Sequence, residues 1–289
     1  MSQIPVPNST VTLTPYDEYL RAPTFVMNLK RRTDRRRHIE REAVTCGFSD
    51  TLVWVEAVDG KYMNPIQVNA HLSLRARQDI HAVKSTHEGL YTSGAVACYE
   101  THRKIWKYII DHKIPSAKVC EDDMKGNVCE LQNVEKYINA LPSDAQYVSL
   151  CKLMMMRGKP KKVLNNPYYL DLDGVLFLKT TSYYITYEGA RLLYERSLPM
   201  EVQVDSYIAY MSLDRNIKAY CLTHPFIEEI STGSDIQTAC IKCMLPDDSQ
   251  FYVGMGICML VLLVALALLV KHMFDQRSKL RDCASKSMK

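Results

Sequence analysis

The chain has 289 residues, a formal net charge of +4 and 47% hydrophobic residues. This composition is that of an ordinary folded domain, and the length suits one good-sized core better than two. The small net charge, concentrated in residues 30–37 and in the C-terminal tail, argues against nucleic-acid binding.

The ten cysteines are scattered, and several lie inside apolar runs. That placement favours reduced, buried thiols over a disulfide framework. Cys240 and Cys243 form the only close pair in the sequence. They lack the second pair or the strand-to-helix context that a zinc or redox site would need.

Residues 1–23 read as a polar leader without a signal peptide, and residues 24–248 as the folded domain. An apolar run at 24–29 predicts a buried strand, residues 34–46 predict a helix ended by Gly47, and residues 51–55 predict a second strand. This order is the opening of an α/β layered domain.

Further along the chain, apolar positions recur at helical spacing between residues 88 and 113, and Pro115 ends that element. Strands are expected at 117–120, 147–153, 175–178 and 183–186, with a helix at 188–196. The alternation predicts a mostly parallel sheet flanked by helices on both faces, with ligands at the carboxyl ends of its strands.

Residues 251–270 contain no charged residue, histidine or amide side chain. At about 1.5 Å of rise per residue they would span roughly 30 Å, the thickness of one hydrocarbon core. The sequence therefore predicts a C-terminal transmembrane helix at 251–270, followed by a basic tail at 271–289, and a lipid bilayer as a partner.

An acidic triplet, Glu121, Asp122 and Asp123, follows directly on the strand expected at 117–120. Clustered carboxylates repel one another unless a cation neutralises them, and hard oxygen ligands select Mg²⁺ or Mn²⁺. Taken alone, such a cluster is more often a solvated loop than a metal site.

Four separated segments, in the same order along the chain, resemble glycosyltransferase family 25, which includes lipooligosaccharide and collagen galactosyltransferases. They lie at residues 25–36, with Asn28, Leu29, Arg32, Asp34 and Arg35; 94–106, with Cys98, His102 and Trp106; 119–123; and 183–205, with Val204 and Asp205. A weaker fifth match covers residues 224–236. Ala97 stands where the family has Gly, and Thr101 where it has Ser.

The resemblance covers residues 24–237 and implies a GT-A type α/β fold that uses a nucleotide-sugar donor such as UDP-galactose. Asp123, together with Asp122, would then hold Mn²⁺ or Mg²⁺ on the donor diphosphate. Glu121 would support the donor site from the strand.

Asn28, Arg32 and Asp34 follow the first strand, where the resemblance places the donor nucleoside, and an arginine can also face phosphate. The basic run at 30–37 could equally be a solvated helix start, an anionic-lipid patch or a nuclear signal. The joint match favours donor binding for Arg32.

His102 lies one helical turn before Trp106, a spacing typical of a core histidine bonded to backbone. The resemblance adds a role in shaping the donor site, while Cys98 reads as buried packing. Asp205 is the candidate general base that would deprotonate an acceptor hydroxyl, with Glu201 as the fallback.

The leading hypothesis is a metal-dependent, inverting hexosyltransferase that moves galactose from a UDP-sugar to a hydroxyl of a glycan, glycolipid or protein. The alternative is a catalytically inactive, membrane-tethered binding or scaffold protein with the same fold.

The expected location is a membrane, reached through the single C-terminal anchor. Two arguments predict opposite orientations. Basic residues after the helix favour a cytosolic tail and hence a luminal or external catalytic domain, whereas the missing signal peptide and the cysteine usage favour a cytosolic catalytic domain. The cytosolic orientation of the catalytic domain is favoured over the luminal one, and a glycan on Asn8 would overturn it.

Overall fold

The computed structural model describes residues 14–80, 88–230, 235 and 236, and isolated positions between 259 and 271. The chain divides into two compact units, residues 1–239 and 240–289, and the fold described below belongs to the first.

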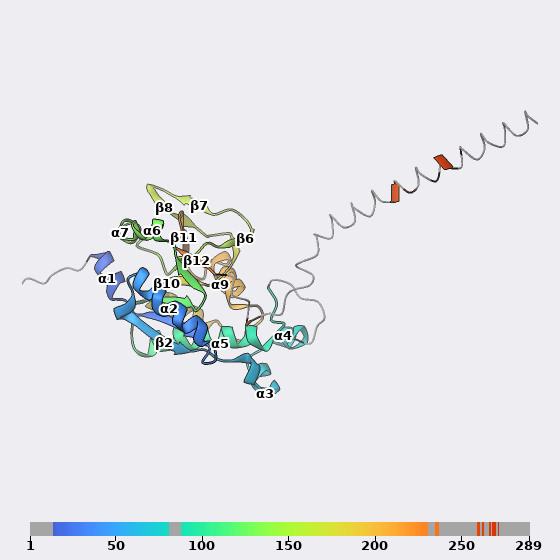
Figure 1. Cartoon of the computed structure of the whole chain (residues 1–289), viewed down its shortest axis with the longest axis horizontal. Coiled ribbons are helices and arrows are strands. Elements are labelled where there is room, and N and C mark those ends of the chain that lie inside the picture. The colour runs from blue at the N-terminus through green and yellow to red at the C-terminus, as the bar shows by residue number, and fades with distance from the viewer. Residues whose placement is uncertain are drawn as a thin grey trace, which may run out of the picture. The chain divides into compact units, whose positions relative to one another are not determined.

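The first unit alternates helices and strands along the chain (Figure 1). Its first half contains α1 (Pro15–Arg21), β1 (Thr24–Asn28), α2 (Thr33–Thr45), η1 (Ser49–Thr51), β2 (Leu52–Glu56), η2 (Gly60–Tyr62), α3 (Pro65–Asn69), α4 (Leu74–Asp79), α5 (Ser93–Asp111), β3 (Ser116–Glu121), β4 (Met124–Gly126), α6 (Val128–Leu131) and α7 (Val134–Asn139). Its second half contains β5 (Tyr147–Ser149), β6 (Met154–Arg157), β7 (Lys161–Val163), β8 (Asn166–Asp171), β9 (Leu176–Leu178), β10 (Ser182–Thr186), α8 (Tyr187–Glu195), α9 (Val204–Leu213), β11 (Ala219–Leu222) and β12 (Ile227–Glu229).

An eight-stranded sheet in the order β2-β1-β3-β10-β5-β11-β8-β7 is the centre of this unit. β1 pairs in parallel with β2 and β3, and β5 pairs in parallel with β11. β10 lies antiparallel between β3 and β5, and β8 lies antiparallel to both β11 and β7. The sheet is therefore mixed.

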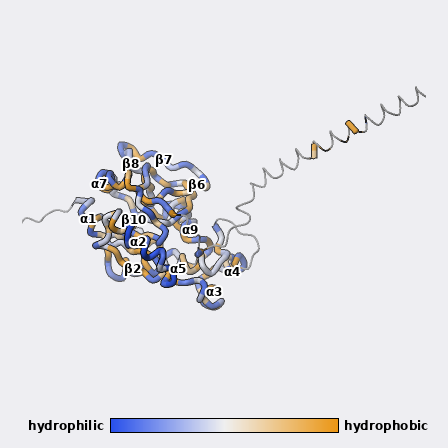
Figure 2. The backbone as a smooth tube through the Cα atoms, in the orientation of Figure 1, coloured by the Kyte–Doolittle hydropathy of each residue, from blue (hydrophilic) through white to orange (hydrophobic). Residues whose placement is uncertain are grey.

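Side chains of β1 alternate between two hydrophobic clusters, one on each face of the sheet. Phe25 and Met27 pack with the buried side of α5, whereas Val26 packs with Ile39 of α2. All five β1 residues are buried, which explains why this strand reads as a continuous apolar run and not as an alternating one. Figure 2 shows α2 as a largely hydrophilic segment, and its described contact with the core is a narrow stripe around Ile39.

Helix α5 is the longest helix among the described residues of the first unit and is capped at its start. The Thr92 hydroxyl accepts a hydrogen bond from the Ala95 N–H, which caps the first turn. Its buried face includes Tyr99, Ile105 and Trp106 and packs on the sheet. The same face carries His102, so the packing of this helix decides where that imidazole lies.

Two expectations from the sequence are corrected here. The sheet is not mostly parallel, because β10 and the β7–β8 hairpin run against their neighbours. A residue pattern records which positions are buried, but it does not record the direction in which a strand enters a sheet.

The second correction concerns the membrane. Among the described residues, no helix is long and apolar enough to cross a bilayer. The predicted span at 251–270 and the single-pass membrane location are corrected on this finding, and a lipid bilayer partner is not shown; most of that stretch lies outside the described residues. Hydropathy alone identifies an apolar run, and the described part of the chain offers no helix to support a span.

Every cysteine that the structure describes is a free thiol, and Cys120, Cys151 and Cys221 are buried. Burial raises the pKa of Cys221 to about 12, so this thiol stays protonated at neutral pH. For these residues the expectation of reduced thiols is confirmed; Cys240 and Cys243 lie outside the described residues.

Truncation of Ile39 should test the layer between α2 and the sheet. Ile39 is 0% exposed, and Ile39→Ala should lower the free energy of unfolding by about 2–5 kcal/mol through lost burial and a residual cavity. Ile66→Ala removes the same atoms from a side chain that is 82% exposed and should change stability by less than about 0.5 kcal/mol. Equal losses in urea unfolding would contradict the assigned packing.

Candidate functional site

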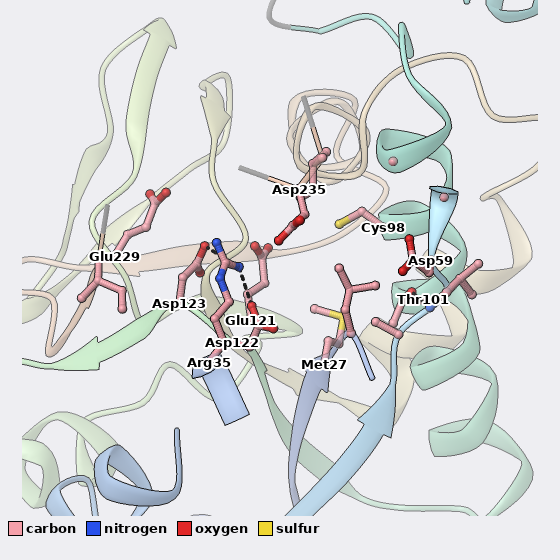
Figure 3. Close-up of a pocket in the computed structure, with 17 residues that line it drawn as sticks. Met27, Arg35, Asp59, Cys98, Thr101, Glu121, Asp122, Asp123, Glu229 and Asp235 are labelled. Carbon is pink, nitrogen blue, oxygen red and sulfur yellow. Dashed lines mark hydrogen bonds and ion pairs between the residues drawn. The ribbon is translucent and has the colours of Figure 1, made fainter. Parts of the chain in front are cut away.

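The carboxyl ends of β1 and β3 meet at one edge of the sheet and open into a cavity of 370 Å³. Figure 3 shows the acidic triplet among the residues that line this cavity, with the Arg35 guanidinium beside it. The cavity is lined by Met27, Leu29, Arg35, Ala57, Val58, Asp59, Gly60, Gly94, Cys98, Thr101, Glu121, Asp122, Asp123, Glu229, Ile230, Asp235 and Ile236.

Asp122 is held by two protein partners. Its Oδ1 accepts a hydrogen bond of 2.6 Å from an Arg35 Nη, and its Oδ2 accepts one of 2.8 Å from the Asn28 amide. Both charged side chains of this ion pair are less than a tenth exposed. Asn28 ends β1, Arg35 lies in the first turn of α2, and Asp122 directly follows β3. The two contacts of Asp122 therefore link the start of α2 to the ends of β1 and β3.

Asp123 differs from its neighbour because one of its oxygens has no protein partner. Oδ2 lies 3.5 Å from the Arg35 guanidinium, whereas the buried Oδ1 accepts no hydrogen bond from any described residue. Burial, and then repulsion from Glu121, raises the pKa of Asp123 to about 7. A buried, unpartnered carboxylate oxygen among like charges is a suitable ligand for a divalent cation.

Glu121 belongs to a hydrogen-bond network on the other side of β3. Thr180 donates to Glu121 Oε1 at 2.6 Å, and the His102 Nε2 lies 3.8 Å from the same oxygen. Burial acts to raise the pKa of Glu121, but the interactions with His102 and Thr180 outweigh it and the pKa is lowered. Cys98, His102 and Glu121 place three potential metal-ligand atoms within 4.8 Å of one another.

Asp205 lies in the first turn of α9 and not in an exposed loop. Its Oδ1 accepts the Ser206 N–H at 2.7 Å, and its Oδ2 accepts the Lys179 N–H at 3.1 Å. Lys179 has a φ of 93°, a conformation that is strained for a residue with a side chain. Asp205 therefore stabilises a strained backbone segment, and burial raises the pKa of its carboxyl.

Arg32 and Asp34 lie beside the cavity and do not line it. They form an ion pair with each other, and the Asp34 side chain is 59% exposed. Arg32 also pairs with Asp235, which in turn accepts an ion pair from Arg31 at 2.9 Å. The structure thus brings Glu121, Asp122 and Asp123 together at the cavity, with Asn28 bonded to Asp122, and leaves Asp34 on the surface.

Close approach of two distant segments forms one wall of the cavity. A Cβ on Gly94 would lie 2.8 Å from the carbonyl oxygens of Asp235 and Ile236, so a side chain there would displace that segment. Gly94 belongs to the segment that carries His102, and Asp235 to the weaker match at 224–236. The fold therefore joins two sequence signals that are separated along the chain.

A second cavity, of 220 Å³, borders the first and shares Cys98, Glu121, Glu229 and Ile236 with it. Asp205 lines this second cavity. Glu229 ends β12, which pairs with β4 immediately after the acidic triplet, and its carboxylate bonds the Lys179 ammonium at 2.6 Å. Glu121 therefore lies where the two cavities meet.

Several residues of this site carry no signal that sequence reasoning could use. Thr180 and Glu229 follow no motif, and their contacts exist only because β10 and β12 approach β3 and β4. Arg35 did lie in a matched pattern, but its partner Asp122 is 87 residues away in sequence. Only the need for a cation to balance the acidic triplet could have indicated the contact between Arg35 and Asp122.

A mixed α/β sheet with a carboxylate-lined cavity at the ends of its first strands is compatible with a glycosyltransferase-like protein. A profile of glycosyltransferase family 25 (LPS biosynthesis protein) matches residues 21–208. The chain belongs to this family, and the resemblance found in the sequence is confirmed.

Known relatives agree with this assignment. Procollagen galactosyltransferase 1 of Danio rerio is 27% identical over 210 residues, which are 70% of this chain and 33% of that protein. Procollagen galactosyltransferase 2 of Homo sapiens is 28% identical over 172 residues, 58% of this chain and 26% of that protein. The alignments thus span about a third or less of these relatives.

One solved structure aligns with most of the chain. It is described as a glycosyltransferase involved in the glycosylation of the major capsid of PBCV-1, and it covers 74% of this chain and 95% of its own. Its TM-score is 0.39 and its sequence identity 8%, a likeness too weak to support an argument.

Removal of the Arg35 charge should destabilise the site. Arg35→Met leaves the Asp122 carboxylate buried without its cation and should lower the free energy of unfolding by about 3–5 kcal/mol. Arg36→Met is the matched control, because that side chain is 48% exposed and its ion pair with Glu40 contributes at most about 1 kcal/mol. Similar denaturant midpoints for the two variants would refute the structural role of the buried pair.

Proposed function

We propose that this chain is a metal-dependent, inverting glycosyltransferase that moves galactose from UDP-galactose to an acceptor hydroxyl. The observation that supports the proposal is the buried Asp123 oxygen in the lining of the 370 Å³ cavity, which accepts no hydrogen bond from any described residue. Membership of the family supports the reaction class, and the names of the relatives support galactose as the sugar.

The donor occupies the first cavity in this proposal. Its volume falls within the range of about 300–1,000 Å³ that small-molecule sites have. Asn28, at the end of β1, borders the position proposed for the nucleoside. Arg32 and Asp34 adjoin this position. The Arg32 guanidinium could bind a donor phosphate if its ion pair with Asp235 is released.

The residues present fit a divalent cation, Mn²⁺ or Mg²⁺. Asp123 would supply Oδ1 as a ligand, whereas both Asp122 oxygens already accept hydrogen bonds and would contribute through electrostatics or after rearrangement. A bound cation would offset the negative charge that develops on the diphosphate as it leaves.

The acceptor occupies the second cavity, with Asp205 as its general base. Asp205 would take the proton of the acceptor hydroxyl while that oxygen bonds to the anomeric carbon and the bond from that carbon to the diphosphate breaks. Burial raises the pKa of Asp205, which makes its carboxylate a stronger base. Because the relatives are named procollagen galactosyltransferases, a protein hydroxyl is the first acceptor to test; glycans and glycolipids are the next.

One observation favours a second candidate, a nucleotide-sugar binding protein without catalysis. The Arg35 guanidinium already lies between Asp122 and Asp123 and neutralises part of the acidic cluster. A protein of this kind would bind a donor without a divalent cation and would transfer nothing. The two candidate functions therefore differ in whether donor binding requires a divalent cation.

Binding of the donor should stabilise the chain only with a metal present. At about 100 times the Kd, UDP plus Mn²⁺ should raise the melting temperature by about 5–10 °C, because a ligand that binds only the folded state stabilises it by mass action. EDTA should abolish the shift, and CMP plus Mn²⁺ should give a smaller one. Equal stabilisation by UDP with EDTA and with Mn²⁺ would favour the metal-free binding protein.

Loss of the Asp123 carboxylate should remove metal-dependent turnover. Asp123→Asn should reduce UDP release from UDP-galactose by about 100-fold or more, because the amide loses the anionic ligand while keeping the shape. Asp111→Asn, at the exposed end of α5, should retain the activity of the unmodified chain. Undiminished Mn²⁺-stimulated activity in the Asp123 variant would sink the proposed metal role.

A further inference from the structure

A buried chain of three side chains leads from the interior of α5 and β10 to Glu121. The Trp106 indole N–H donates to the Tyr183 hydroxyl at 3.0 Å, and that hydroxyl lies 2.8 Å from the His102 Nδ1. Trp106, Tyr183 and His102 are each 0% exposed. The other ring nitrogen of His102, Nε2, faces Glu121 Oε1 at 3.8 Å and has no hydrogen-bond partner among the described residues.

The hydrogen-bond donors and acceptors of these three side chains fix the position of the imidazole proton. An indole can only donate, so the Tyr183 oxygen must accept from Trp106. The hydroxyl hydrogen of Tyr183 then needs an acceptor, and His102 Nδ1 is the one that the described residues offer. A nitrogen that accepts carries no proton, so the ring proton of His102 lies on Nε2 and points towards Glu121.

The same reasoning decides against a metal at Cys98, His102 and Glu121, although their ligand atoms lie within 4.8 Å of one another. A metal would need a bare Nε2, which moves the ring proton to Nδ1. The Tyr183 hydroxyl hydrogen would then be buried without an acceptor, a cost of about 1–3 kcal/mol.

We propose that His102 is a positioning residue that presents its Nε2–H to Glu121 and holds that carboxylate at the junction of the two cavities. Thr180, just before β10, donates to the same oxygen at 2.6 Å, so Oε1 lies between the Thr180 hydroxyl and the His102 ring, and Glu121 lines both cavities. The gap of 3.8 Å is longer than a hydrogen bond. It closes when the donor binds, as catalytic hydrogen bonds of unliganded sites commonly do.

The catalytic consequence rests on the proposed function. As the diphosphate leaves, positive charge develops on the transferred sugar ring, and a fixed carboxylate at the junction of donor and acceptor stabilises it. A carboxylate that has to reorient would stabilise it less, because the reorganisation adds to the barrier. His102 therefore affects the rate of transfer without contacting the nucleotide.

The proton position can be measured directly on the 289-residue chain. Long-range ¹H–¹⁵N NMR with ¹⁵N-labelled histidine should show Nε2 of His102 protonated and Nδ1 bare, with assignment from the missing signal in His102→Gln. Tyr183→Phe should give a tautomer mixture, and Glu121→Gln should move the Nε2–H resonance. A proton on Nδ1 in the unmodified chain, or a ring shift on adding Zn²⁺ alone, would overturn the assignment.

Kinetics on the same variants test the positioning role. His102→Leu should lower kcat by about 10- to 100-fold and leave the KM for UDP-galactose within about twofold, because the lost donor acts on the transition state. His102→Gln, whose amide can donate from the same place, should recover most of kcat. Equal losses in both variants, or a loss confined to KM, would refute the role.

Failure of the inference can be told from failure of the proposed function. If the unmodified chain transfers no sugar, the proposed function falls, and the NMR measurement still decides the tautomer and the Glu121 contact. If transfer occurs but the His102 ring carries its proton on Nδ1, the inference falls and the proposed function stands.

Discussion

The need to neutralise buried negative charge at the carboxyl ends of β1 and β3 governs this structure. Glu121, Asp122 and Asp123 follow one another where the strand ends, and each keeps little contact with water. Arg35 offsets the charge on Asp122, while His102 and Thr180 act on Glu121. Asp123 keeps one oxygen without a partner among the described residues, and burial, followed by the Glu121 charge, raises its pKa to about 7. A site that binds a cation is the arrangement that such residual charge favours.

Much of the fold could be predicted because burial leaves a periodic trace in the sequence. The strand expected at 24–29 is β1, and the helix expected at 34–46 is α2, with boundaries within one residue. Strand direction could not be predicted in this way, since β10 reads identically whether it lies parallel or antiparallel to β3. The membrane span expected at 251–270 is not supported by any helix among the described residues.

The candidate site was predictable as a location but less so as a set of roles. The acidic triplet lies where the sequence places it, yet Asp122 has both oxygens occupied, and Asp34 faces solvent. His102 does not bond to backbone, as a core histidine of that spacing would, but to the Tyr183 hydroxyl. The hydrogen-bond partners of Asp122 and His102 lie 81 to 94 residues away, and no local pattern records such contacts.

The antiparallel entry of β10 decides which residues lie beside the acidic triplet. In a parallel arrangement, the end of that strand and the loop after it would lie at this edge of the sheet. Because β10 runs the other way, its first residues, and the Thr180 and Lys179 segment before them, lie beside Glu121. That segment lines the second cavity, where the Asp205 carboxylate fixes its strained backbone. The strand direction that the sequence could not reveal therefore decides which backbone segment meets Glu121 and lines this cavity.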